Sequence, residues 1–183
     1  EILFLKPFES EGASGADFNY RSGFRGWIGV QREDGLGVRL TGFDYFQRSG
    51  TPQTTQPRRV LDINSLDAEV IDSFNICNWN LLVGGGIRYL SFRDDFPTST
   101  TSGAEFHGLG PVISVQITRA VNENWSVYGI AREALLFGNS NFSGGPTTRD
   151  TTGFVSELQA GLQYNRVLSR GGIGFARFGW EGQ

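Results

Sequence analysis

Residues 60–93 read VLDINSLDAEVIDSFNICNWNLLVGGGIRYLSFR, and this stretch decides the fold class. Between residues 66 and 76, apolar side chains (Leu66, Ala68, Val70, Phe74, Ile76) alternate with polar ones (Asp67, Glu69, Ser73, Asn75). A period of two residues is typical of a β-strand with one apolar and one polar face. A second strand-like run, Trp79–Arg93, follows after only Cys77 and Asn78. The stretch therefore predicts a long β-hairpin.

The same alternation covers nearly the whole chain, and helical periodicity is almost absent. We expect nine strands: Glu1–Phe8, Phe18–Arg32, Leu36–Arg48, Val60–Ile76, Trp79–Arg93, Glu105–Arg119, Trp125–Gly138, Gly153–Arg166 and Gly171–Gln183. Short connections (Glu33–Gly35, Cys77-Asn78, Val121–Asn124, Val167–Arg170) alternate with long polar ones (Glu9–Asp17, Ser49–Arg59, Asp94–Ala104, Asn139–Thr152). In an up-and-down sheet this order puts every long loop at one end, as in a transmembrane barrel with short periplasmic turns.

Composition excludes several classes of protein. The 183 residues predict a single domain, 1–183, and the net charge of −3 provides no basic surface for nucleic acid. The single cysteine, Cys77, has no partner for a disulfide within the chain, and together with the single histidine, His107, it forms no metal-ligand cluster. No apolar run approaches the ~18 residues of a transmembrane helix. The sequence implies no cofactor.

Alternation alone does not tell which face of the sheet points inward. A lipocalin-like soluble barrel turns its apolar face inward, whereas a membrane barrel turns it toward lipid. Glycines on the polar face favour the membrane arrangement, because they leave room in a narrow interior: Gly29, Gly84, Gly86, Gly108, Gly110 and Gly161. Aromatic residues at strand ends resemble interfacial girdles: Trp79, Trp125 and Tyr164 beside short turns, and Tyr45, Phe46, Phe92, Phe106, Phe137 and Phe154 beside long loops. The sequence therefore predicts an all-β, antiparallel up-and-down transmembrane β-barrel of about 8–10 strands in a bacterial outer membrane.

On this prediction, six charged residues line the interior: Arg25, Arg39, Asp67, Glu69, Arg88 and Glu157. Charges of both signs in a narrow space of low dielectric constant should pair, so one expectation is a salt-bridge network that fills the interior. A wetted, selective pore lined by the same residues is a second expectation, and a bound small ligand is a third.

The strand Trp125–Gly138 departs from the pattern, because the adjacent Arg132 and Glu133 must point to opposite faces. Whichever points outward meets lipid near the middle of the strand, at a cost of up to ~2–4 kcal/mol for arginine. A β-bulge or burial against a neighbouring subunit would remove this conflict. We expect this strand to lie at a protein–protein contact.

Several stretches, taken in order, resemble the major outer-membrane protein family of Legionella, which has relatives in planctomycetes. They are Ile2–Phe8 (ILFLKPF), Gly23–Gly35 (GFRGWIGVQREDG), Leu66–Phe74 (LDAEVIDSF), Gly84–Tyr89 (GGGIRY), Phe106–Pro111 (FHGLGP), Trp125–Gly138 (WSVYGIAREALLFG), Glu157–Tyr164 (ELQAGLQY) and Phe178–Gln183 (FGWEGQ). The resemblance implies an outer-membrane barrel that forms a pore, and it implies no catalytic residues.

In that family the last motif continues into one more strand. The number of predicted strands, nine, leads to the same expectation, because bacterial single-chain barrels have an even number of strands with both ends periplasmic. We expect about ten strands in the intact barrel, with a closing strand beyond Gln183. The alternative is an eight-stranded closure in which Glu1–Phe8 lies outside the barrel.

The expected function is a porin-like narrow pore for small solutes. The alternative is a non-conducting barrel that anchors or scaffolds a larger outer-membrane assembly through its loops. An enzyme is not expected, because neither a G-x-S-x-G elbow nor a Walker-type phosphate loop occurs, and His107 with Ser102 and Asp94 is a weak constellation. The expected partners are outer-membrane lipid and a homo-oligomer or larger membrane assembly, without nucleic acid.

Overall fold

The computed structural model describes residues 2–5, 21–48, 60–95, 103–142, 148–167 and 173–182. These residues form nine β-strands: β1 (Ile2–Leu5), β2 (Arg21–Gln31), β3 (Gly37–Arg48), β4 (Val60–Ile76), β5 (Trp79–Asp95), β6 (Gly103–Ala120), β7 (Trp125–Phe142), β8 (Thr148–Val167) and β9 (Ile173–Gly182). Within the described ranges there is no helix, and hence none of the length and apolarity needed to cross a membrane. The connection between β1 and β2 and residues 49–59, 96–102 and 143–147 of the other long connections lie outside these ranges, as does the predicted turn Val167–Arg170 beyond its first residue.

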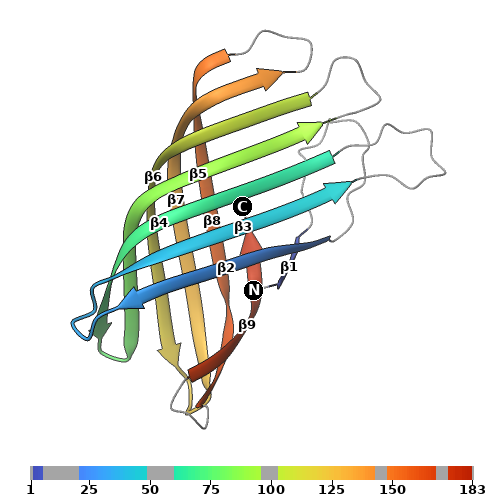
Figure 1. The fold of residues 1–183 in the computed structure, drawn as a ribbon. Coiled ribbons are helices and arrows are strands. Elements are labelled where there is room, and N and C mark those ends of the chain that lie inside the picture. Colours follow the sequence, from blue (N-terminus) through green and yellow to red (C-terminus); the bar gives the residue numbers. More distant parts are fainter. Residues whose placement is uncertain are drawn as a thin grey trace, which may run out of the picture.

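The nine strands form one sheet in chain order, and each strand is antiparallel to its neighbours. The sheet curls into a half-barrel, with β2 to β5 on one side and β7 to β9 on the other (Figure 1). The prediction of an all-β up-and-down sheet is therefore confirmed. β1 pairs with β2, so Ile2–Leu5 belongs to the sheet, which disfavours the eight-stranded alternative that left Glu1–Phe8 outside the barrel.

Strand boundaries follow the predicted pattern most closely in the middle of the chain. The bounds of β4 are those expected, whereas β7 and β8 extend further than expected into the connection between them. Asn139–Phe142 and Thr148–Thr152 were predicted as loop, but they belong to these strands. Backbone pairing of β6 with β7 continues to Phe142 because ladder hydrogen bonds do not depend on side-chain polarity.

The β2–β3, β4–β5 and β6–β7 turns share one end of the sheet, along the lower left and the bottom of Figure 1. In the β2–β3 turn, the Arg32 amide donates to the Leu36 carbonyl at 2.9 Å, and Gly35 adopts a φ of 98° that favours glycine. In the β4–β5 turn, Cys77 takes a positive φ of 54°. The longer connections join the strands at the opposite end. One end of the half-barrel therefore carries the tight turns and the other end carries the long connections.

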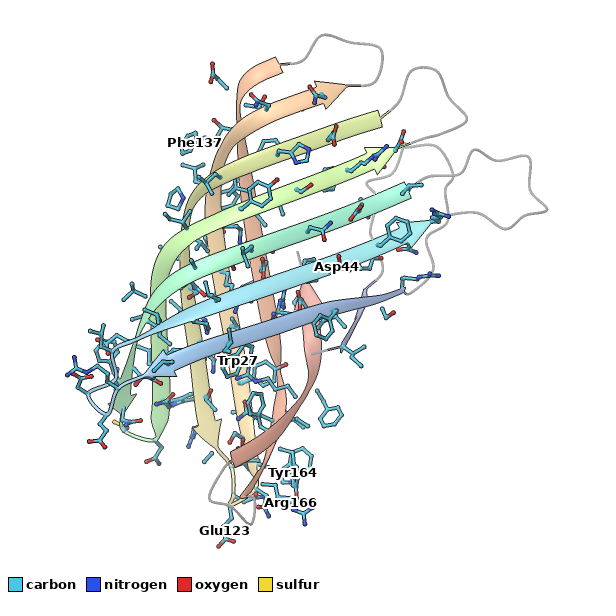
Figure 2. All side chains as sticks on the ribbon, viewed as in Figure 1. Trp27, Asp44, Glu123, Phe137, Tyr164 and Arg166 are labelled. Carbon is cyan, nitrogen blue, oxygen red and sulfur yellow. The ribbon has the colours of Figure 1, made fainter. Side chains whose placement is uncertain are left out.

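The convex face carries an apolar band bordered by a polar row. Across β3 to β7, the cross-strand partners Asp44, Asn64, Ser91, His107 and Asn139 form the polar row near the ends that the long connections join. The next row toward the turns is apolar, with Leu66, Tyr89, Leu109 and Phe137. Figure 2 shows the turn end beyond the band, where Glu123, Tyr164 and Arg166 lie. Large apolar side chains therefore cover the outside of the curved sheet.

Two apolar clusters lie on the concave face near the ends that the long connections join. One cluster there contains Phe43, Tyr45 and Leu61, with Phe92 packed against it. A second contains Leu90, Val112, Ala134 and Leu136, with Phe106 packed against it. Together they fill this end of the concave side.

These clusters correct the predicted aromatic girdle. Tyr45 is 2 % exposed, and its hydroxyl donates to Gln47 on the same face. Tyr45, Phe92 and Phe106 share a face with inward residues of their strands, so they belong to the interior and not to an outer belt. Phe46, Phe137 and Phe154 are exposed on the convex side, as the girdle requires.

Candidate functional site

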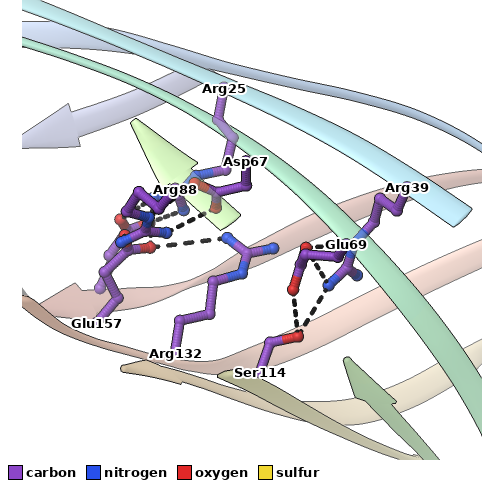
Figure 3. Close-up of polar contacts among 9 residues, drawn as sticks. Arg25, Arg39, Asp67, Glu69, Arg88, Ser114, Arg132 and Glu157 are labelled. Atoms are coloured by element: carbon purple, nitrogen blue, oxygen red, sulfur yellow. Dashed lines mark hydrogen bonds and ion pairs between the residues drawn. The ribbon is translucent and has the colours of Figure 1, made fainter. Parts of the chain in front are cut away.

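The six predicted interior charges all lie on the concave face, midway along the sheet. Arg25, Arg39, Asp67, Glu69, Arg88 and Glu157 are each at most 8 % exposed. Figure 3 shows how they converge from strands that are distant in the sheet. We call these residues, together with Arg132, Glu181 and Ser114, the ion cluster.

The central pair of the ion cluster is Arg88 and Asp67. They are direct cross-strand partners on β5 and β4, and the guanidinium donates to both carboxylate oxygens, each at 2.7 Å. This two-point geometry is the strongest form of arginine–carboxylate pairing. The remaining Nη1 of Arg88 lies 2.5 Å from Glu157 on β8, so the pair also spans the concave side of the half-barrel.

Glu157 is the hub that joins the two walls. Its carboxylate lies 3.1 Å from Arg25 on β2, 2.5 Å from Arg88 and 3.6 Å from Arg132 on β7. Arg25 in turn holds Glu181 on β9 through two hydrogen bonds of 2.7 and 2.8 Å. Near the turn end, Trp27 on β2 stacks on Phe175 on β9 with ring centroids 6.1 Å apart. Side chains of strands near the two edges of the sheet thus meet across its open side.

A second group lies beside this hub. Arg39 and Glu69 are cross-strand partners joined at 3.0 Å, and Ser114 Oγ donates to Glu69 at 2.5 Å while it accepts from Arg39 at 3.2 Å. Gly84 makes this packing fit, because a Cβ there would lie 2.4 Å from Ser114 Oγ and 3.0 Å from a Glu69 oxygen. The predicted role of glycine in a crowded interior is visible at this position.

Three members of the ion cluster were not among the predicted interior residues. Glu181 and Ser114 occupy the polar parity of their strands, so alternation could have identified both. The face of Arg132 stayed open in the sequence, because its neighbour is also charged. The structure points Arg132 inward, where it is 4 % exposed.

Glu133 consequently lies on the convex face, within the apolar band. Its Oε1 accepts a hydrogen bond from Ser156 on β8 at 2.8 Å, whereas its buried Oε2 has no partner among the described residues. Pairing with β6 and β8 runs without a bulge at Arg132 and Glu133. A bulge therefore does not remove the conflict at these two residues, and the expected protein–protein contact at this strand remains a prediction.

The ion cluster is neutral among the described residues, with four arginines (Arg25, Arg39, Arg88, Arg132) and four carboxylates (Asp67, Glu69, Glu157, Glu181). Buried charges persist only when they are paired in this way. The cluster can therefore tie opposite walls together without leaving net charge inside.

The described ranges hold no metal-binding or catalytic group of side chains comparable to the ion cluster. These ranges contain no group of three or more histidine, cysteine or acidic residues that could hold a metal ion. His107 lies on the convex face, with its Nε2 3.0 Å from Glu105. Ser102, which was considered with it, lies outside the described residues.

No protein-family model matches this chain, and neither the comparison with curated proteins nor that with solved structures finds a match.

Proposed function

We propose that this chain forms the wall of an outer-membrane β-barrel, with its convex face against lipid and its ion cluster inside. The observation that carries the proposal is the inversion of the two faces. Ile28, Ile113 and Phe154 are 72 %, 62 % and 70 % exposed on the convex side, whereas Arg88 and Asp67 are each 1 % exposed on the concave side. In water, it is unfavourable to expose large apolar side chains and also unfavourable to bury charged ones.

The size of the apolar band supports the same proposal. On β5 it runs from Tyr89 to Trp79, which is ten residue steps. Ten steps span about 33 Å along a strand, or about 25 Å along the axis of a barrel whose strands tilt by about 40°. That height matches the apolar belt of a transmembrane barrel.

Two matched substitutions test the membrane proposal. Ile113 lies in the apolar band and Val121 lies in the β6–β7 turn beyond it, and they are 62 % and 64 % exposed. In lipid vesicles Ile113→Arg should lower the free energy of unfolding by about 2–4 kcal/mol, and Val121→Arg should lower it by no more than about 1 kcal/mol. If the convex face were in water, both changes would stay within about 0.5 kcal/mol, and that result would reject the proposal.

Within this barrel, the function we propose is a porin-like narrow conduit for small solutes. Its support is a cavity that lies against the ion cluster on the turn side, where four arginines and three glutamines line the space together with five apolar side chains. Interiors of barrels with few strands are nearly filled by side chains, so the conduit would be narrow.

A second candidate, a non-conducting barrel that anchors a larger assembly, has its own support. Arg88 and Glu157 pair across the interior, and the apolar clusters around Phe43 and Leu136 fill the end that the long connections join. Both features close the interior without a need for a solute.

Single-channel conductance in planar bilayers separates these two candidates. Reproducible steps that grow in Arg88→Ala would establish a conduit that passes this arginine, because the variant removes a side chain that crosses the interior. Silence from both proteins, with folding verified by heat-modifiable gel migration, would reject the conduit and favour the anchor.

A further inference from the structure

A cavity of about 190 Å³ opens on the turn side of the ion cluster. Gln31, the last residue of β2, lines it, and so do Gln116 on β6 and Gln159 on β8. Four arginines contribute to its lining: Arg25, Arg39, Arg132 and Arg177. No aspartate or glutamate lines the cavity among the residues that the structure describes.

Arg132 is the arginine of this lining whose hydrogen-bonding capacity is least satisfied. Arg25 and Arg39 donate to carboxylates at 3.1 Å or less. The contact of Arg132 with Glu157 is 3.6 Å, and Glu157 is shared with Arg25 and Arg88. Arg132 Nε has no hydrogen-bond partner in the described part of the chain, although the residue is 4 % exposed. Arg132 lines the cavity and has one long carboxylate contact among the described residues, so its guanidinium is a preorganised donor for a ligand there.

The chemistry of the lining selects the class of ligand. A planar guanidinium matches the oxygens of carboxylates and phosphates, to which it can donate two parallel hydrogen bonds. The side-chain amides of Gln116 and Gln159 add neutral donors, and the stacked rings of Trp27 and Phe175 form an apolar wall. The volume corresponds to about six water molecules at roughly 30 Å³ each, which suits a small anion and excludes a polymer.

We propose that this cavity is a binding site for a small oxyanion, with Arg132 as the principal donor. Inorganic phosphate and a small carboxylate such as succinate share the required chemistry. The site does not rest on the proposed conduit, because a binding cavity needs only one open end. It adds to the ion cluster a feature that a purely structural network would not need, namely an arginine kept available for a ligand.

Calorimetric titration of the folded protein in detergent tests the site. Sodium phosphate and sodium succinate are titrated separately, with sodium chloride at matched ionic strength as the reference. We expect saturable binding of at least one of the two oxyanions. Arg132→Gln should weaken it about 10- to 100-fold, the loss expected for one hydrogen bond to a charged group. Arg93→Gln is the matched control, because the Arg93 side chain is 57 % exposed and does not line the cavity, and it should bind as the wild type does.

A second variant keeps the test decisive if Arg132→Gln does not fold. Gln116→Glu is nearly isosteric and places a carboxylate in the cavity, so it should abolish oxyanion binding by repelling the ligand and by occupying Arg132. The wild-type protein also carries a reporter, since Trp27 lines the cavity and the tryptophan fluorescence of the protein should change with the same saturation as the heat signal. Folded wild-type protein that shows no saturable response to either oxyanion would overturn the proposal. Unchanged binding in Gln116→Glu would overturn it as well.

Discussion

Removing the charge of Glu157 should destabilise the protein strongly. Its side chain is 7 % exposed, and its carboxylate lies within 3.6 Å of Arg25, Arg88 and Arg132. In Glu157→Gln the ion cluster would keep four arginines against three carboxylates. Losing one partner of a buried ion pair costs about 3–5 kcal/mol, because an uncompensated charge stays in a medium of low dielectric constant. We expect the free energy of unfolding to fall by that amount.

Urea unfolding of protein refolded into lipid vesicles measures this change. Glu105→Gln is the control, since the Glu105 side chain is 41 % exposed and pairs with His107 on the convex face. An exposed pair contributes at most about 1 kcal/mol, so this variant should remain close to the wild type. The double variant Glu157→Gln/Arg132→Gln restores neutrality by removing the most loosely held arginine. It should therefore be more stable than Glu157→Gln alone.

Two results would refute this reasoning. If Glu157→Gln stayed within about 1 kcal/mol of the wild type, the cluster would be screened by water, and a wetted conduit would gain support. If the double variant were less stable than Glu157→Gln, charge balance would not be what holds the walls together. In that case, the packing of the Arg132 side chain in the interior would carry the effect.

Three further predictions follow from single positions. Glu133→Leu should stabilise the isolated protein in lipid vesicles by roughly 1–3 kcal/mol, because it removes from the apolar band a carboxylate whose buried Oε2 has no partner among the described residues. A loss of oligomers in the same variant would support a protein contact at β7. Gly84→Ala should cost about 1–3 kcal/mol of unfolding free energy, because its Cβ would displace Ser114 from Glu69, and a stability equal to the wild type would show that the interior is loosely packed. Cys77, the single cysteine, is exposed in a tight turn, so a membrane-impermeant maleimide should label it only from the periplasmic side, and labelling of intact cells would reverse the proposed orientation.

Much of the fold could be predicted because the side-chain period of a strand is two. Parity alone assigns each residue of β4 or β8 to a face, which is why the predicted interior charges Asp67 and Glu157 lie on the concave side. The errors arose where position was used in place of parity. Tyr45 and Phe106 were assigned to an outer girdle because they are near strand ends, although each shares a face with interior residues.

The sequence by itself determined the strands, the alternation of short and long connections and the two faces of the sheet, since these depend only on local spacing. The tertiary structure alone decided which charges meet. Arg88 on β5 reaches Glu157 on β8 because the curvature of the whole sheet brings these walls together, and no local pattern encodes that curvature. The pairing of β7 with β6 and β8 also decided that Arg132 points inward and Glu133 outward, because both faces of this strand carry apolar residues and the local pattern is ambiguous.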